Sequence, residues 1–356
     1  MGYGLDLGEY GYSQRIEKLY KSIKGAEGTI RARVLADHGL GFVIAAEAGE
    51  LEAVMSGGML AEGGPMRPVA GDWVTARLAP EGGHAQITSV LPRFSCLERA
   101  DTMVGWKKTV VAANFDYLII MVSMNANYGL NRIERMVLAA KASGGRPVLA
   151  LSKADLCPDA QGLAERARAV AADTDVIAFS SISGEGTSRI MSYFKRGITC
   201  AVVGSSGVGK STLLNRLMGY EAAKTAAIRE EDSKGRHTTT YRALHLLPKG
   251  GLFLDTPGIR AFGLTAGEDE LDSTFTDIKE IAANCRFSDC SHKKEPGCAV
   301  LKAVEEGDLD ERRYMSYMKM AKELDYVRAS YDRAVWQERK KRGKAIAMFS
   351  RKLKKQ

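Results

Sequence analysis

Gly204-Ser205-Ser206-Gly207-Val208-Gly209-Lys210-Ser211 is the stretch that decides the fold this sequence predicts. It satisfies the pattern G-x-x-x-x-G-K-[ST], and it stands between an apolar run at residues 199–203 and a helical pattern that begins at Thr212. Glycines let successive backbone N–H groups point at one anion, and the start of the helix adds partial positive charge. The stretch therefore predicts a phosphate-binding loop, in which Lys210 reaches the β- and γ-phosphates and Ser211 ligates Mg²⁺.

Apolar strands alternate with amphipathic helices on both sides of this loop. Strands are expected at residues 117–123, 147–152, 176–180, 199–203, 241–247 and 252–255, and helices at residues 131–141 and 160–172. This alternation is typical of a parallel sheet with helices on both faces. We expect this central α/β domain to span residues 97–264.

A carboxylate ends another apolar strand, in the segment Asp255-Thr256-Pro257-Gly258. Alone, Asp-x-Pro-Gly is typical of an ordinary turn. Downstream of a phosphate loop, the segment predicts that Asp255 holds Mg²⁺ through water and that the N–H of Gly258 meets the γ-phosphate.

The base is predicted from Ser152-Lys153-Ala154-Asp155, which follows a further strand. A carboxylate accepts two parallel N–H bonds from the edge of guanine, which adenine cannot offer, so Asp155 favours GTP over ATP. Lys153 would lie along the base and ribose, and the turn Ser180-Ser181-Ile182 would donate a backbone N–H to the guanine oxygen. Taken singly, a Ser-Lys-x-Asp segment is more often a helix cap.

The order of these segments is unusual. In ordinary GTPases the phosphate loop comes first and the guanine segments last, whereas here Asp155 and Ser181 precede Lys210. The sequence therefore predicts a circularly permuted domain, in which the contacts of the site are kept and the chain ends are moved. The segment at Asp255 then leads directly into a C-terminal domain, on which a nucleotide-dependent shift could pull.

Five short runs rich in Val, Ile and Thr precede this domain. They lie at residues 29–35, 41–46, 51–55, 73–78 and 85–91, and glycine pairs separate several of them. Five short strands with glycine turns favour a small barrel over residues 25–96, with an OB-fold as the natural candidate. The strand count alone does not separate it from an SH3-like barrel. Residues 1–24 form a polar extension for which the sequence predicts no role.

Three cysteines and one histidine crowd together with the spacing C-x4-C-x-H-x5-C, as Cys285, Cys290, His292 and Cys298. In a chain with no export signal, such crowding favours a metal over disulfides. Three thiolates and one imidazole make a closed tetrahedral set that suits one Zn²⁺ ion and leaves no position for a catalytic water. We expect a structural zinc site in a mainly helical domain at residues 265–330, and a chance cluster of core cysteines is the alternative.

The positive charge of the chain gathers in its tail. Residues 331–356 hold ten Lys or Arg and two acids, a difference that equals the whole net charge of +8. Such a cluster attracts phosphate backbones through counterion release. A solvated basic helix end that only aids solubility explains the charge equally well.

Together these features resemble the ribosome small-subunit-dependent GTPase A family, over residues from about 29 to about 330. The resemblance also rests on Gly235-Arg236-His237-Thr238-Thr239-Thr240, on Gly71-Asp72-Trp73-Val74 and on Ala112-Ala113-Asn114-Phe115-Asp116. It implies a GTPase that binds the small ribosomal subunit and its rRNA, acts in late assembly of that subunit and is stimulated by it. One departure is Ser152, where GTPases usually carry Asn, and the shorter hydroxyl is expected to tether its loop less well.

The resemblance also points to the residues of hydrolysis. Many GTPases orient the attacking water with a Gln just after Asp-x-x-Gly, but Ile259 stands at that position. The resemblance implies that His237 takes this role, because a neutral imidazole can accept a proton or orient water near pH 7. A surface histidine in a loop is the alternative. One of Thr238, Thr239 and Thr240 should ligate Mg²⁺ when GTP is bound, and the spacing does not say which.

Two other functions stay open from the sequence. One is a non-catalytic RNA-binding module whose GTP/GDP site only gates affinity, and the other is a GTPase that acts on membranes. The longest apolar stretch, residues 117–122, is far shorter than the roughly 20 residues that span a bilayer. The tail lacks a broad apolar face as well. We therefore expect a cytoplasmic monomer with no membrane partner.

Overall fold

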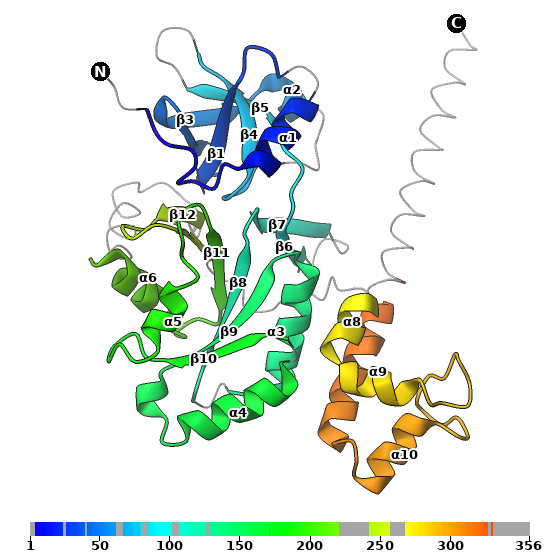
Figure 1. Ribbon diagram of the computed structural model, residues 1–356. Helices are drawn as coiled ribbons and strands as arrows, with labels where there is room; N and C mark the ends of the chain where they lie inside the picture. Colours follow the sequence, from blue (N-terminus) through cyan, green and yellow to red (C-terminus); the bar gives the residue numbers. More distant parts are fainter. Residues whose placement is uncertain are drawn as a thin grey trace, which may run out of the picture. The chain divides into compact units, whose positions relative to one another are not determined.

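The computed structural model describes residues 4–23, 26–39, 41–61, 67–79, 84–101, 107–125, 128–171, 173–220, 242–256, 268–326 and 329. The chain divides into two compact units, Met1–Arg99 with Val110–Phe262, and Ala100–Thr109 with Gly263–Gln356. The first holds the barrel and the α/β domain, and the second is mainly helical (Figure 1). Among the described residues, no helix is long and apolar enough to cross a membrane.

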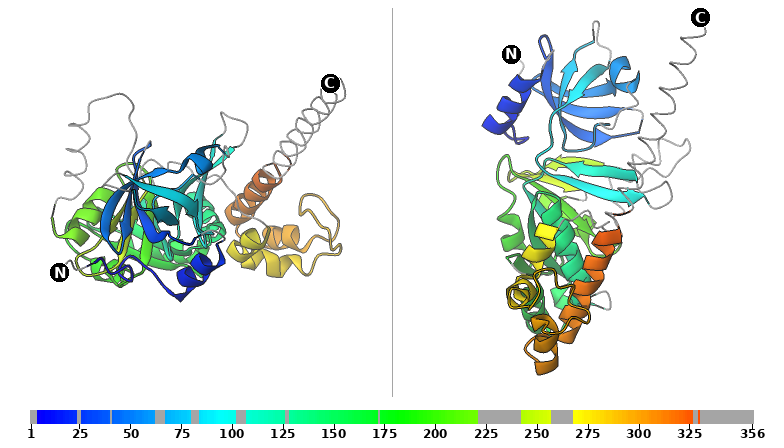
Figure 2. Two further views of the ribbon diagram at one scale, coloured as in Figure 1. Left: turned by 90° about the horizontal axis from the view of Figure 1, so that it is seen from above. Right: turned by 90° about the vertical axis from the view of Figure 1, so that its right-hand side faces the viewer.

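The barrel, which Figure 2 shows from two sides, is closed by five strands. These are β1 (Ile30–Asp37), β2 (Phe42–Ala46), β3 (Gly49–Met55), β4 (Trp73–Arg77) and β5 (Ala85–Val90), with the short helix α2 (Gly57–Ala61) between β3 and β4. Hydrogen bonds connect them in the closed order β1-β2-β3-β5-β4-β1, with β3 and β5 parallel. Val34, Ile44, Val74 and Ile87 are among the apolar side chains that fill the interior. This closed Greek-key order confirms the OB-like barrel.

The α/β domain has a sheet of six strands in the order β10-β9-β8-β11-β13-β12. The strands are β8 (Tyr117–Ser123), β9 (Arg146–Ser152), β10 (Asp175–Phe179), β11 (Thr199–Gly204), β12 (Arg242–Leu246) and β13 (Leu252–Asp255). All neighbouring pairs are parallel except β12 with β13. The carboxyl ends of five strands therefore meet at one edge, which is where open α/β sheets bind ligands.

Helices cover both faces of this sheet (Figure 1). They are α3 (Leu130–Ala142), α4 (Ala160–Val170), α5 (Thr187–Met191) and α6 (Lys210–Met218). Ile119 and Met121 of β8 share a buried cluster with Ile190 of α5 and Leu213 of α6. Because side chains alternate along a strand, Leu118 and Ile120 face the opposite layer, to which α3 belongs. The expected parallel sheet with two helical layers is confirmed.

The barrel and the α/β sheet are one continuous sheet. Strand β1 of the barrel pairs antiparallel with β12, with Ala36 opposite Ala243 and Asp37 opposite Arg242. The N-terminal extension, for which the sequence predicts no role, packs on the same unit. Its helix α1 (Gln14–Ser22) buries Ile16, and the ring of Tyr12 meets that of Trp73 edge-on at 5.3 Å.

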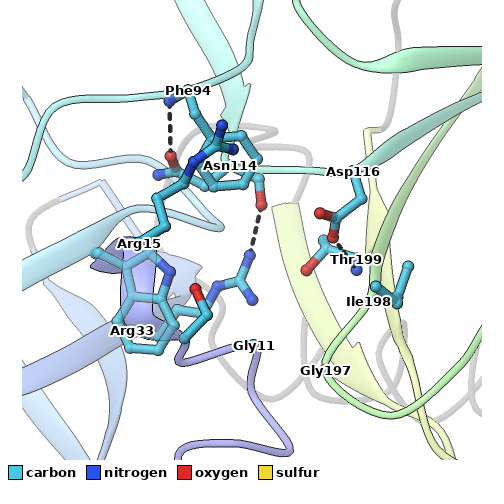
Figure 3. A pocket seen from close by; sticks show the side chains of 11 residues that line it. Gly11, Arg15, Arg33, Phe94, Asn114, Asp116, Gly197, Ile198 and Thr199 are labelled. Atoms are coloured by element: carbon cyan, nitrogen blue, oxygen red, sulfur yellow. Dashed lines mark hydrogen bonds between the residues drawn. The ribbon is translucent and has the colours of Figure 1, made fainter. Parts of the chain in front are cut away.

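A buried guanidinium holds the junction of barrel and α/β domain (Figure 3). Arg33 donates hydrogen bonds to the carbonyl oxygens of Tyr10, Gly71 and Asn114, the last at 2.7 Å. Burial lowers the pKa of Arg33 to about 10, so it stays charged at neutral pH. A cavity of about 240 Å³ lies beside it, lined also by Asp116, whose carboxylate accepts the N–H of Thr199 at 2.8 Å.

Gly71 and Asp72 both have structural roles at this junction. Gly71 has φ +91°, and a Cβ there would collide with the carbonyl oxygen of Ala113. The buried carboxylate of Asp72 accepts two bonds from Arg93, at 2.8 and 2.7 Å, and one from the N–H of Val69 at 2.9 Å. A buried pair with this many partners is costly to break from one side.

We therefore expect Arg93→Ala to lower the free energy of unfolding by about 3–5 kcal/mol, because it leaves the Asp72 carboxylate buried without its partner. Urea unfolding would measure this. Arg189→Ala is the matched control, since the Arg189–Asp175 pair is 58% and 43% exposed and should cost less than about 1 kcal/mol. Equal losses in the two variants would contradict the prediction.

The second unit contains helices α8 (Glu268–Thr274), α9 (Thr276–Ala282) and α10 (Ala299–Glu306), with a further helical run over residues 311–326. Arg313 ties two of these segments, because its guanidinium donates to both carboxylate oxygens of Asp277, at 2.9 and 2.8 Å. A two-stranded sheet of β6 (Cys96–Asp101) and β7 (Lys107–Ala113), which the sequence does not predict, runs from the first unit into residues assigned to the second.

Candidate nucleotide site and metal centre

The phosphate-loop motif lies where strand and helix meet, as its spacing predicts. Strand β11 ends at Gly204 and α6 begins at Lys210, so the motif fills the connection between them. Gly207 and Gly209 have φ +74° and +105°, in the left-handed region that favours glycine. The Nζ of Lys210 donates to the carbonyl oxygen of Gly204 at 2.8 Å, so the side chain folds back over its own loop.

Asp255 ends the neighbouring strand at the same edge. It is opposite Val202 in the pairing of β13 with β11. Burial raises the pKa of Asp255 and lowers that of Lys210, and each of the two charges opposes the shift of the other. Among the buried side-chain oxygens and nitrogens of the described residues, only Oδ1 of Asp255 has no hydrogen-bond partner. A buried carboxylate with an oxygen that has no hydrogen-bond partner fits a hydrated cation such as Mg²⁺.

The segment at the end of β9 for which the sequence predicts guanine binding is bonded to the phosphate loop. The hydroxyl of Ser152, the last residue of β9, donates to the carbonyl oxygen of Val208 at 2.7 Å. That this hydroxyl tethers the loop less well than an asparagine would stays a prediction; it reaches the loop because β9 ends close to it. After it, Lys153 adopts a left-handed conformation with φ +64°, and Asp155 lies in the short helix η2 (Ala154–Leu156).

The turn after β10 is built around Ser180. Its Oγ accepts the N–H groups of Ile182 at 3.2 Å and Ser183 at 3.1 Å. Within the described part of the chain, the N–H of Ser181 is left without a partner. It is therefore a donor of this turn that is available to a ligand. The side chain of Ile182 is 77% exposed and that of Leu156 is 70% exposed, so both guanine segments carry apolar surface.

One side chain that the sequence analysis did not single out touches this turn. Arg216, in the last turn of α6, donates from Nη1 to the carbonyl oxygens of Ser181 at 3.0 Å and Ile182 at 3.3 Å. No motif includes it, and the backbone carbonyls that it contacts carry no sequence signature.

Some of the candidate residues lie outside the part that the structure describes. These are His237, Thr238, Thr239, Thr240 and Gly258, together with the basic tail at residues 331–356. The remaining candidates all lie at or next to the carboxyl ends of β9, β10, β11 and β13. They are Ser152, Lys153, Asp155, Ser180, Ser181, Ile182, the residues of the phosphate loop, and Asp255. The topology thus gathers them at one edge of the sheet.

The four candidate metal ligands lie together in the second unit. The ligand atoms of Cys285, Cys290, His292 and Cys298 all lie within 4.8 Å of one another, so the cluster could hold a metal ion. The Nδ1 of His292 is 3.6 Å from the sulfur atoms of both Cys285 and Cys298. Such separations suit four donors around one ion.

Polar contacts hold the loop around this cluster. The carboxylate of Glu295 accepts the backbone N–H groups of Lys293 at 2.9 Å and Lys294 at 3.0 Å. The hydroxyl of Tyr314 donates to the carbonyl oxygen of His292 at 2.8 Å. The backbone that carries the ligands is therefore fixed by side chains from within the loop and from the helical run that follows.

Comparison with known proteins agrees with this geometry. The model of the RsgA GTPase family matches residues 90–265. The small ribosomal subunit biogenesis GTPase RsgA of Methanosarcina acetivorans is 36% identical over 97% of this chain and 92% of its own length. The crystal structure of YjeQ from Thermotoga maritima covers 83% of this chain and 98% of its own, with 27% identity and a TM-score of 0.60. That of YloQ, described as a circularly permuted GTPase, covers 85% and 97%, with 23% identity and a TM-score of 0.59, and shows the same fold. With its phosphate loop behind its guanine segments and a relative this similar along nearly its whole length, the chain belongs to the RsgA GTPase family.

Proposed function

We propose that this protein hydrolyses GTP in the pocket at the carboxyl edge of the sheet, and that it does so while maturing the small ribosomal subunit. The observation that carries the proposal is the interaction of Lys210, at the start of α6, with Asp255, at the end of the strand next to β11. Ser152 bonds the predicted guanine segment to the same loop. The name of the Methanosarcina relative supports the partner, since it is a biogenesis factor of that subunit.

Within this pocket the chain's residues divide the work. Asp155 accepts the guanine N–H groups, the N–H of Ser181 meets the guanine oxygen, and Lys210 exchanges the carbonyl of Gly204 for phosphate oxygens. Ser211, Asp255 and one threonine of residues 238–240 would hold Mg²⁺, which neutralises charge on the phosphates. His237 would orient the attacking water, because Ile259 has no amide to do so.

Hydrolysis measured with and without purified small subunits tests the proposal. We expect slow turnover by the protein alone, stimulation by the subunits, and loss of the stimulated rate in His237→Ala. GTP cleavage that subunits do not accelerate, and that His237→Ala does not impair, would favour the alternative of an RNA-binding module whose nucleotide only gates affinity. Co-sedimentation with subunits in GDP and in a non-hydrolysable GTP analogue would then show whether the nucleotide controls binding.

We further propose that the cluster of three cysteines and His292 binds one structural Zn²⁺ ion. The donor set supports zinc, because three thiolates and one imidazole complete a tetrahedral shell. The loop around it carries Arg286, Lys293 and Lys294, which could face RNA phosphates.

Removal of this metal should loosen the second unit. We expect about one zinc per chain by elemental analysis, and a strong chelator should lower the midpoint of thermal unfolding by several degrees, because metal binding contributes directly to folding. Cys290→Ser should lose the zinc. Cys157→Ser is the control, since Cys157 is a free thiol of the first unit, and it should retain the metal. Zinc retained in full by Cys290→Ser would exclude this ligand set.

A further inference from the structure

A single side chain of the phosphate-loop helix holds the turn that follows β10. Arg216 lies near the end of α6, and its Nη1 donates to two consecutive carbonyl oxygens, those of Ser181 and Ile182. Hydrogen bonds with a charged donor are roughly twice as strong as neutral ones. The guanidinium therefore joins the helix that begins at the phosphate loop to a turn 35 and 34 positions earlier in the chain.

The turn is shaped to receive this side chain. Gly184 has φ +92°, and a Cβ there would collide with Nη2 of Arg216. The hydroxyl of Thr187 donates to the carbonyl oxygen of Gly184 at 2.6 Å, and the N–H of Gly184 donates to that of Ser180 at 3.0 Å. Every one of these contacts fixes the backbone of residues 180–187. Among the described residues, these contacts leave the N–H of Ser181 without a hydrogen-bond partner.

We propose that Arg216 is a positioning residue for guanine, which holds the turn so that the N–H of Ser181 meets the guanine oxygen. This inference rests on the proposed function. Ser152 joins the segment after β9 to the phosphate loop, and Arg216 joins the turn after β10 to the helix of that loop. Both halves of the base site are thereby fixed to the element that holds the phosphates. Arg216 itself contacts backbone only and acts through Ser181.

Nucleotide affinity of Arg216→Ala tests this role. We expect the Kd for GDP to rise about tenfold, which corresponds to about 1.4 kcal/mol. The Kd for 6-thio-GDP should rise less than about threefold, because a sulfur at this position is a weak acceptor and gains little from a well-placed donor. In GTP hydrolysis KM should rise while kcat at saturation is unchanged, and Arg216→Lys should recover part of the loss, since an ammonium still donates to a carbonyl.

Arg168→Ala is the matched control. Arg168 is likewise an exposed arginine in the last turn of a helix, α4, and no contact of its side chain is recorded in the described part of the chain. Its replacement should leave both affinities unchanged. If thermal unfolding shows that Arg216→Ala is not folded, Arg216→Gln is measured in the same comparison, because its neutral amide still supplies a side-chain donor.

Three results would overturn the inference: GDP affinity of the variant equal to that of Arg168→Ala, equal losses for GDP and 6-thio-GDP, or a fall in kcat with KM unchanged. They are distinct from failure of the proposed function. The unaltered protein reports that failure: its GTP hydrolysis would not be accelerated by small subunits, or it would bind neither GDP nor GTP.

Discussion

Lys210→Ala should reduce GTP hydrolysis by about 100-fold to 1000-fold, the loss that follows removal of one preorganised donor to developing charge. The proposed role of this ammonium is to contact the bound phosphates, and in the structure it donates to the carbonyl oxygen of Gly204 at 2.8 Å. Its removal also takes away a positive charge that holds down the pKa of the buried Asp255 carboxylate. Phosphate contact and cation binding therefore weaken together.

Single-turnover hydrolysis with saturating GTP and Mg²⁺ would measure this effect. Lys195→Ala is the matched control, because Lys195 is an exposed lysine of the same unit, in the connection that precedes β11. It should retain the full rate. If Lys210→Ala hydrolysed GTP as fast as this control, the phosphate loop would have no part in the reaction.

Asp155→Asn should change the base preference of the nucleotide site from guanine to xanthine. In the proposed site the carboxylate would accept two parallel N–H groups of guanine, whereas an amide has one acceptor and one donor, so one guanine N–H would then face another N–H. A site built for such a pair rejects a ligand that leaves it unsatisfied by a large factor. We expect GDP to bind at least about 100-fold more weakly, since each bond to a charged group contributes about 1.5–3 kcal/mol.

Xanthine carries an oxygen where guanine carries its amino group, and the new amide can donate to it. Xanthosine diphosphate (XDP) should therefore displace a fluorescent nucleoside diphosphate from the Asp155→Asn variant better than GDP does. ADP should displace this probe neither from the variant nor from the unaltered protein. Asp159→Asn is the control, since it makes the same change four residues away and an asparagine still caps α4, where Asp159 accepts the N–H of Gly162. A variant that still preferred GDP would mean that Asp155 does not touch the base.

The sequence predicts most of this fold because its signals are local. The run at residues 252–255 is a strand with the same bounds in the structure, and the run at residues 199–203 gains only Gly204. A glycine-rich loop between strand and helix requires left-handed residues at fixed positions, so its pattern is specific. Asp155 and Lys210 are far apart in sequence, yet parallel strands bring their ends to one edge, and this rule is enough to place them together.

What the sequence does not predict depends on contacts between distant positions. The N-terminal extension looks polar, but Leu7, Tyr10 and Ile16 are buried against the barrel unit, and three apolar residues at irregular spacing make no pattern. The role of Arg33 depends on carbonyl oxygens brought to it from three segments. In the sequence Arg216 has no feature that separates it from other surface arginines. Its contact arises because the fold brings the turn after β10 next to it.

The pairing of β1 with β12 has a consequence for how such a molecule meets a large RNA. Because the barrel strand and the GTPase strand share hydrogen bonds, the two domains would dock as one body on the proposed ribosomal partner, and the loss of translational and rotational freedom on association would be incurred once for both. A phosphate contact made by the barrel would then raise the effective concentration of the nucleotide edge near the same RNA. Two individually weak contacts would in this way together give slow dissociation of the protein from the RNA.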